Sequence, residues 1–368
     1  MKRTGLLALA SFIFGAGLCL PPAAAQDGAA SEETSYKAKL VGLPFVYYSP
    51  ETTLAFGAGG VMTFRVGANK ARTRTSSIWA YASYNLEKQF NVLIKPEIYL
   101  QGNDFSLSGS LRFERAPQRF YGLGDDTASI DQESFTPRTI AAEIGIKRRL
   151  VAGLFAGLRF NFENTTMEKV EAGGLLAPGT IPGSHGGLLA GFGGSLDWDT
   201  RDASMFPRRG AYLQFTADVY NAVAGSEFSF NRFNLNLRKY LPLGPDQVLA
   251  LQAYALTTGG DVPFYKLALV GGDTLLRGYY KGRFRDKSLA LVQAEYRALI
   301  SDRIGVVGFA GAAQVFAGLD HFGSGSVKLS AGTGVRYVIS KRDGTTVRLD
   351  MAWGDRSFGF YITAQEAF

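Results

Sequence analysis

The side chains best suited to one specific chemical contact lie in a glycine-rich segment that spans residues 271–283. At its centre stand Leu276, Arg277, Gly278 and Tyr279, which set a guanidinium among glycines and aromatic rings. A guanidinium that is shielded from water needs a planar acceptor, and a carboxylate supplies one through two parallel hydrogen bonds. The chemistry expected of Arg277 is therefore ion pairing that holds this segment against another part of the chain.

A candidate carboxylate follows at Glu295. Polar and apolar side chains alternate between residues 292 and 298, so Gln293, Glu295 and Arg297 share one face of a strand. We therefore expect Glu295 to pair with Arg277. From the sequence alone the alternative, in which Arg277 is an ordinary exposed loop arginine, stays open.

No catalytic constellation accompanies this pair in the sequence. The two histidines, His185 and His321, lie among glycines and serines without the spacing of a metal site. The Gly-x-Ser-x-Gly turn of a serine hydrolase is absent, and residues 323–326 read as a flexible loop. We expect no enzyme activity, no cofactor and no bound metal.

The elements that must position Arg277 are indicated by alternation of apolar and polar side chains. In residues 105–114 the odd positions are apolar or glycine and the even positions are serine, arginine or glutamate. A period of two is typical of a strand with one apolar and one wet face. Sixteen segments share the pattern: 40–48, 54–66, 76–86, 89–100, 104–115, 137–149, 152–164, 187–199, 210–221, 226–241, 247–257, 288–300, 304–317, 326–340, 345–354 and 357–368.

These segments predict an all-β fold, a transmembrane antiparallel β-barrel of about 16 strands, an even number as in bacterial barrels. Mean hydropathy is near zero, as expected where only alternate residues are apolar. Tight turns at 301–303 and 341–344 contrast with long connections at 116–136, 165–186 and 258–287, which indicates short periplasmic turns and long outer loops. The alternative is a soluble β-sandwich, which rarely needs sixteen strands in one chain.

The first residues predict export. Lys2 and Arg3 precede an apolar stretch and an Ala23-Ala24-Ala25 site, the order of a secretory signal peptide. We expect residues 1–25 to be the signal, 26–39 a short polar segment and 40–368 the barrel, in the bacterial outer membrane. Cleavage removes the one cysteine, Cys19, and lowers the formal charge from +7 to +5, without the basic clusters of a nucleic-acid binder.

The motif at residues 276–279 resembles that of the bacterial surface antigen superfamily, the barrel of BamA/TamA-type assembly factors and two-partner-secretion transporters. The family carries a hydrophobic-Arg-Gly-aromatic motif in a long sixth outer loop that folds into the lumen. Further similar stretches lie at 43–44 with 49–52, at 119–124, and at a mid-barrel turn with Asp199, Arg201, Asp202, Pro207 and Gly210. Together they cover residues 43–368.

The resemblance also has departures. Family members commonly offer a second acid in a Phe-x-Asp-x-Gly pattern, and Gly311 stands at that place here. The ion pairing of Arg277 that holds the loop in place is then expected to be weaker or to use Glu295 alone. The last strand, with Phe360, Ile362 and Phe368, is similar to the signal by which the barrel assembly machinery recognises its substrates, although Glu366 stands where an apolar residue is usual.

Three functions fit these observations. The resemblance implies a barrel that assists insertion or translocation of proteins, or of lipid, although the family's POTRA domains, which receive clients, are not expected in so short a leader. A passive pore is the second, because charged strips predict a polar interior: Lys95, Glu97, Arg112, Arg159, Arg336, Arg348 and Asp350. The third is a structural barrel that works with a separate periplasmic partner or client. Outer-membrane lipid is the expected surrounding, and no nucleic acid is expected.

Overall fold

The computed structural model describes residues 38–67, 73–127, 132–203, 206–340 and 345–368. The expected signal peptide at residues 1–25 and residues 26–37 of the expected polar segment lie outside the described residues. The expected turn at 341–344 does so as well.

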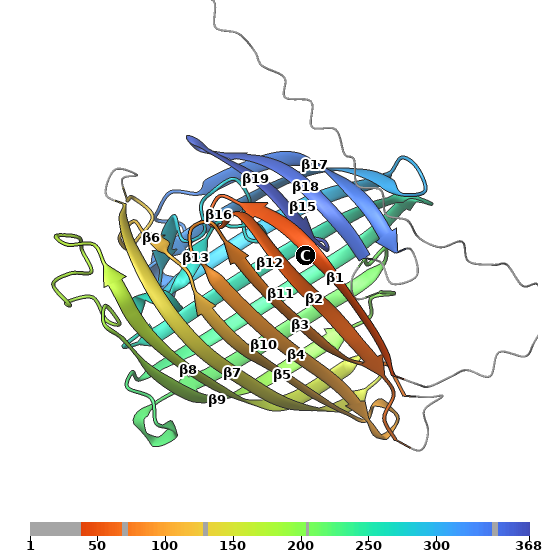
Figure 1. The fold of residues 1–368 in the computed structure, drawn as a ribbon, viewed down its shortest axis with the longest axis horizontal. Helices are drawn as coiled ribbons and strands as arrows, with labels where there is room; N and C mark the ends of the chain where they lie inside the picture. The colour runs from red at the N-terminus through yellow and green to blue at the C-terminus, as the bar shows by residue number, and fades with distance from the viewer. Residues whose placement is uncertain (1–37, 68–72, 128–131, 204–205, 341–344) are drawn as a thin grey trace, which may run out of the picture. The chain divides into compact units, whose positions relative to one another are not determined.

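Sixteen strands form one closed antiparallel barrel (Figure 1). In chain order each strand pairs with the next, and β1 also pairs with β19 to close the ring. The barrel strands are β1 (Lys39–Ser49), β2 (Thr53–Phe64), β3 (Ser76–Asn85), β4 (Phe90–Leu100), β5 (Phe105–Arg115), β7 (Glu133–Val151), β8 (Leu154–Val170), β9 (Gly186–Asp199), β10 (Gly210–Tyr220), β11 (Phe230–Gly244), β12 (Gln247–Gly260), β15 (Ser288–Leu299), β16 (Ile304–Phe316), β17 (Lys328–Ser340), β18 (Thr345–Gly354) and β19 (Ser357–Ala364).

The short elements lie in the connections. β6 (Gln118–Phe120) pairs with the start of β7, while β13 (Ala268–Val270) and β14 (Phe284–Asp286) pair with each other inside the β12–β15 connection. Four single-turn 3-10 segments lie in the described connections: η1 (Gln101–Asn103), η3 (Ala222–Ala224), η4 (Phe264–Lys266) and η5 (Leu319–His321). Among the described residues, no helix has the length and apolarity to cross a bilayer.

The sixteen predicted strands are confirmed, and the largest differences are at β7 and β8. These two strands pair far beyond the predicted ends, out to Phe135 and Val170. Pro137 stands at a register shift within β7, and the residues beyond it lack the regular apolar alternation on which the prediction depended. The last strand ends at Ala364 rather than at Phe368.

Burial in the barrel is inverted relative to a water-soluble protein. On β8 Leu158 is 72% exposed while Glu163 is 8% exposed, and on β17 Leu329 is 64% exposed while Arg336 is 1% exposed. A sandwich would bury the apolar face, so the soluble alternative is wrong. The outward faces are those of a barrel surrounded by lipid.

The lengths of the connections do not separate the two ends as simply as expected. Glu51, in the short β1–β2 turn, accepts a hydrogen bond from the Lys281 N–H of the long β12–β15 connection, so a short and a long connection share one end. At the opposite end, residues 200–209 form a long connection between β9 and β10. At the end that carries the β12–β15 connection, the short turns 50–52 and 355–356 adjoin β1 and β19, the two strands where the barrel closes.

The closure between β1 and β19 is the weakest ladder of the barrel. Tyr48 and Ile362 are the one pair of facing residues recorded between these two fully described strands. By contrast β18 and β19 pair over eight positions, and β1 and β2 over eleven. We call this junction the seam.

The inverted burial predicts the effect of a charge on the outward face. Leu158→Arg should destabilise the folded barrel, by up to roughly 2–4 kcal/mol, because its guanidinium would replace an alkyl group in hydrocarbon. Urea unfolding of the liposome-inserted protein, followed by tryptophan fluorescence, measures this loss. Leu175→Arg, at an exposed position of the β8–β9 connection, is the control and should change stability little. Equal effects of the two substitutions would contradict the assignment of the outward face.

Candidate functional site

Arg277 lies in the β12–β15 connection, residues 261–287, and is buried between two acids. Its Nη2 atom is 2.5 Å from Glu295 Oε2 on β15, and its Nη1 atom is 2.6 Å from Asp350 Oδ2 on β18. The guanidinium carbon also lies 3.4 Å from the ring centre of Phe309 on β16, a cation–π distance. Arg277 is 1% exposed, so it is not a solvated loop arginine.

The second acid comes from a strand that sequence reasoning did not select. At Gly311 an added Cβ would lie 2.9 Å from Gln293 Cβ and 3.0 Å from Leu276 Cδ1, so this position on β16 has little room for an acidic side chain. Asp350 supplies the carboxylate from β18 instead. The expectation of Glu295 alone is wrong. The signal available in the sequence was the place of Asp350 on a charged inward strip with Arg348.

The two acids belong to a larger set that we call the arginine–carboxylate network. Glu295 also contacts Arg297 Nε at 2.8 Å, and Asp350 also contacts Arg336 Nη1 at 2.5 Å. Its members are the cations Arg277, Arg297, Arg336 and Arg348 and the anions Asp273, Glu295, Asp350 and Glu366. Among these side chains, four formal positive charges therefore face four negative ones. Such a balance is required because an unpaired buried charge is strongly destabilising.

The neighbours of Arg277 in the motif contact the strands near the seam. The Gly278 N–H donates a hydrogen bond of 3.0 Å to the Tyr361 hydroxyl on β19. Gly278 has φ +105°, and an added Cβ would lie 2.9 Å from the backbone carbon of Trp353, so glycine is required there. The Tyr279 hydroxyl donates to the Leu329 carbonyl at 2.8 Å and accepts from the Asp355 N–H at 2.8 Å.

Leu276 anchors the same segment by apolar packing. It is buried in a cluster with Tyr279 and with residues of β12, β13, β14, β15 and β16: Leu256, Ala268, Val270, Phe284, Leu289, Leu291, Ala313 and Val315. The four residues of the sequence motif are thus brought together with Glu295. The geometry can hold a loop in place, and it offers no nucleophile or paired general acid and base at the contact.

A second anchor of the connection lies near its start. Lys266 Nζ is 2.8 Å from Glu163 Oε2 on β8, far around the barrel from β15 and β18. Burial lowers the pKa of Lys266, and the carboxylate of Glu163 opposes this shift. The adjacent Phe264 packs in a cluster with Phe120, Phe135, Leu176, Leu189, Tyr220 and Phe230. Sequence reasoning missed Lys266, because nothing in the local pattern indicates a partner 103 residues away.

The stretch at 119–124 also contacts the long connection. Arg119 lies over the Tyr280 ring at 5.3 Å, and the Gly124 N–H donates to the Arg285 carbonyl at 2.8 Å. Arg285 in turn lies over the rings of Phe120 and Phe264, and burial lowers its pKa to about 10. The similar stretches at 119–124 and 276–279 therefore belong to one packed region.

The mid-barrel turn stands apart from this region. Arg201 pairs with Asp199 through Nε at 2.9 Å and Nη2 at 3.0 Å, and Asp202 accepts from the Arg208 N–H at 3.0 Å. Gly210 has φ +103°, and Pro207 is buried. The contacts fix the β9–β10 connection itself and do not reach the Arg277 motif.

The last residues divide between the outside and the inside of the barrel. Phe360 and Ile362 lie on the face of β19 that carries the exposed Phe358, and Phe360 packs against Tyr48 of β1 at a ring distance of 5.7 Å. Phe368 lies beyond the strand and is buried with Tyr240, Val248 and Ala250. Its backbone oxygen accepts from Arg297 Nη2 at 2.9 Å. Glu366, the residue unlike the usual pattern, pairs with Arg336 Nε at 2.8 Å.

No group of three or more His, Cys, Asp or Glu side chains in the described part of the chain could hold a metal ion. His321 is exposed and lies 3.1 Å from Asp320.

The network predicts a coupled response to loss of its charges. Arg277→Ala and Glu295→Gln should each destabilise the barrel by about 3–5 kcal/mol, because each leaves buried charges of one sign in excess. The double variant restores the charge balance. Its loss of unfolding free energy should be about 0.5–3 kcal/mol smaller than the sum of the losses in the two single variants. Unfolding free energies in urea measure the cycle.

The exposed pair Arg208 and Asp246, 3.4 Å apart, provides the matched control. Arg208→Ala and Asp246→Asn should change stability by no more than about 1 kcal/mol, as surface ion pairs do. Additive losses at Arg277 and Glu295 would show that the two charges do not act as a pair.

Comparisons with known proteins agree with this architecture. Residues 56–363 match the model of the Omp85 superfamily domain. BamA from Haemophilus ducreyi lacking POTRA domains 1–3 is 17% identical, with a TM-score of 0.61 over 89% of this chain and 70% of that one. CdiB from Acinetobacter baumannii is 12% identical, with a TM-score of 0.57 over 89% and 59%, and CdiB from Escherichia coli is 11% identical, with a TM-score of 0.59 over 88% and 62%.

The chain thus spans less than two thirds of either CdiB chain. No curated protein sequence matched. The family match covers most of the chain and the structures share its fold, so the resemblance noted in the sequence is confirmed. This chain is a β-barrel of the bacterial outer membrane, and it belongs to the Omp85 superfamily.

Proposed function

We propose that this barrel assists the insertion or translocation of polypeptides at the outer membrane through the seam between β1 and β19. The observation that carries the proposal is the single facing pair, Tyr48 and Ile362, at that junction. A strand with an unpaired edge offers backbone donors and acceptors to an incoming strand. Apart from Tyr48, β1 has no recorded ladder partner on its β19 side, although its other edge pairs fully with β2.

The β12–β15 connection is the proposed long sixth outer loop, folded into the lumen as a plug. Two anchors support this placement. Arg277 contacts the inward-facing acids of β15 and β18, and Lys266 contacts the inward-facing Glu163 of β8. These strands lie on different parts of the wall, so the connection spans the space between them. Apolar clusters around Leu276 and Phe264 fill that space further.

The loop also contacts both sides of the seam. The Gly278 N–H donates to Tyr361 of β19, and the Lys281 N–H donates to Glu51 in the turn that follows β1. A change in the loop would therefore act on both strands that must separate. This arrangement supports a transport or insertion role rather than an enzymatic one. A client polypeptide is the proposed partner, and a periplasmic protein that delivers it is compatible with the same geometry.

A disulfide across the seam tests the proposal. In the oxidised Tyr48→Cys, Ile362→Cys variant, the barrel should no longer accelerate client folding. The disulfide holds β1 to β19, so the seam cannot open and a client strand cannot pair with the edge of β1. The assay follows folding of a urea-denatured eight-stranded outer-membrane barrel into proteoliposomes, and reduction should restore it. Ala331→Cys with Trp353→Cys, facing positions on β17 and β18, is the control and should leave the rate unchanged. Equal rates with an oxidised and a reduced seam would rule out this route.

The pore is the second candidate function, favoured by the charged interior. Planar-bilayer recording separates the two. A plugged barrel should conduct little, and Arg277→Ala should raise its conductance and its noise, because the loop loses its central anchor. Large and stable currents through the unmodified protein would favour the pore.

A further inference from the structure

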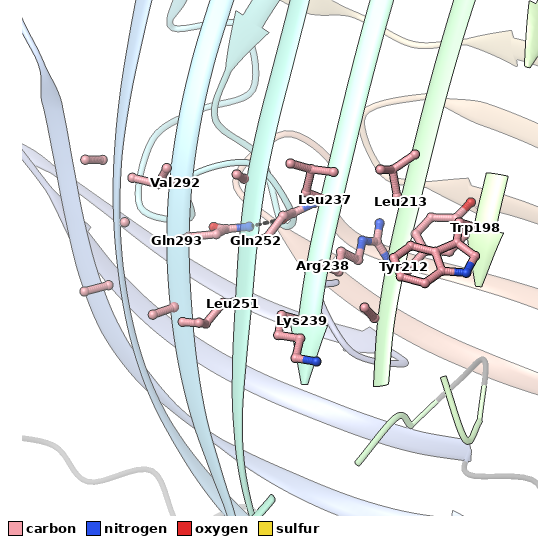
Figure 2. A pocket seen from close by; sticks show the side chains of 16 residues that line it. Trp198, Tyr212, Leu213, Leu237, Arg238, Lys239, Leu251, Gln252, Val292 and Gln293 are labelled. Carbon is pink, nitrogen blue, oxygen red and sulfur yellow. Dashed lines mark hydrogen bonds between the residues drawn. The ribbon is translucent and has the colours of Figure 1, made fainter. Parts of the chain in front are cut away.

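The outward wall of the barrel carries a hollow that the proposed insertion role does not use. Its volume is about 720 Å³, and it extends across β9, β10, β11, β12, β15 and β16 (Figure 2). That volume is in the range of sites that hold small molecules. Most of the lining side chains belong to the outward face, where Trp198 is 44% exposed and Val292 is 58% exposed.

The strand register explains the shape of the hollow. Facing positions connect its lining residues in two adjacent rows across the sheet. One row is Trp198, Leu213, Leu237, Ala253, Val292 and Ala312, and the other is Ala211, Lys239, Leu251, Ala294 and Ala310. Alanines on β12, β15 and β16 form a low floor, whereas tryptophan, leucine and valine side chains stand higher beside them. This difference in side-chain height forms an apolar groove in a surface that faces lipid.

One cation stands at this groove. Lys239 is the one charged side chain on the outward faces of β9, β10, β11, β12, β15 and β16, strands that the structure describes throughout. It is exposed and forms no ion pair with the described residues. Lys239 faces Ala211, the second residue of β10, so it lies toward the end of the barrel that carries the β9–β10 and β11–β12 connections. A lysine at this depth can extend its ammonium group toward the headgroup region.

We propose that the groove binds one phospholipid, with an acyl chain along the alanine floor and the headgroup phosphate at Lys239. The apolar lining fits an acyl chain, and the single cation fits the negative charge of a phosphodiester. A client strand is a poor fit, because the strands under the groove already pair on both edges and offer no free backbone groups. The site lies on the outward wall and is independent of the seam and of the loop.

Two variants of the full barrel test the site. Ala294→Leu with Ala310→Leu fills the floor, and Lys239→Gln removes the charge while keeping the length of the side chain roughly similar. Ala217→Leu, on the outward face of β10 and outside the groove, is the control for added bulk on the wall. Heat-modifiable migration establishes that each variant is folded before binding is measured.

The measurement is native mass spectrometry of the detergent-purified barrel titrated with phosphatidylglycerol or phosphatidylethanolamine. We expect one phospholipid retained by the unmodified protein and by Ala217→Leu. The filled variant should need at least tenfold more lipid for the same occupancy, and Lys239→Gln should weaken retention of both lipids. Unchanged retention by the folded filled variant would overturn the proposal. Equal retention by the unmodified protein and by Lys239→Gln would also overturn it, as would retention of lipopolysaccharide in place of phospholipid.

Discussion

The buried arginine–carboxylate network is the interaction on which the interior of this barrel depends. A guanidinium or carboxylate removed from water is stable only when its partners are in place, and here each of Arg277, Arg336, Glu295 and Asp350 contacts at least two charges of opposite sign. The members come from the long connection, from β15, β17 and β18, and from the residues after β19. The network is therefore complete only when distant parts of the chain have all reached their places.

The network and the seam give the barrel two regions of different strength. Around most of the ring, long ladders and buried charge pairs hold neighbouring strands. At the seam one facing pair remains, and the aromatic contact between Tyr48 and Phe360 adds apolar packing on the outward side. The motif at 276–279 lies where these regions meet, because Arg277 is in the network while Gly278 bonds to Tyr361 of β19. The buried network is thus adjacent to the barrel ladder with the fewest facing pairs.

The fold could be predicted from the sequence because alternation is a local property that each strand carries by itself. The outward face of β17, with Leu329 and Val335, is readable from that strand alone. Pairing across the barrel is a different matter. The sequence indicated that Glu295 and Asp350 face inward, but only the closed ring shows that both reach one guanidinium.

Other features were beyond local patterns for similar reasons. Lys266 and Glu163 meet although they are far apart in the sequence and lie on different elements, and a local pattern of apolar and polar residues cannot indicate such a contact. Glu366 looked like a departure from a terminal strand pattern, and its reason is a contact with Arg336 inside the barrel. The terminal aromatic on an alternating pattern predicts a strand that continues to Phe368, whereas the strand ends at Ala364 and the chain turns inward at Gln365, which has φ +66°.

The seam has a consequence for the order in which the barrel can form. Tyr48 and Ile362 are 314 positions apart (362 minus 48), whereas every other ladder joins strands that follow one another in the ring order of the chain. Ladders between consecutive strands join residues that are close in the sequence, so they can form one after another. Ring closure joins the most distant strands, and the fewest backbone pairs compensate its entropy cost. We therefore expect closure to be the last step of folding, with an open sheet that has two unpaired edges as its precursor. Because one facing pair joins β1 to β19, we expect the finished barrel to return to the open-sheet geometry more readily at the seam than at any other ladder.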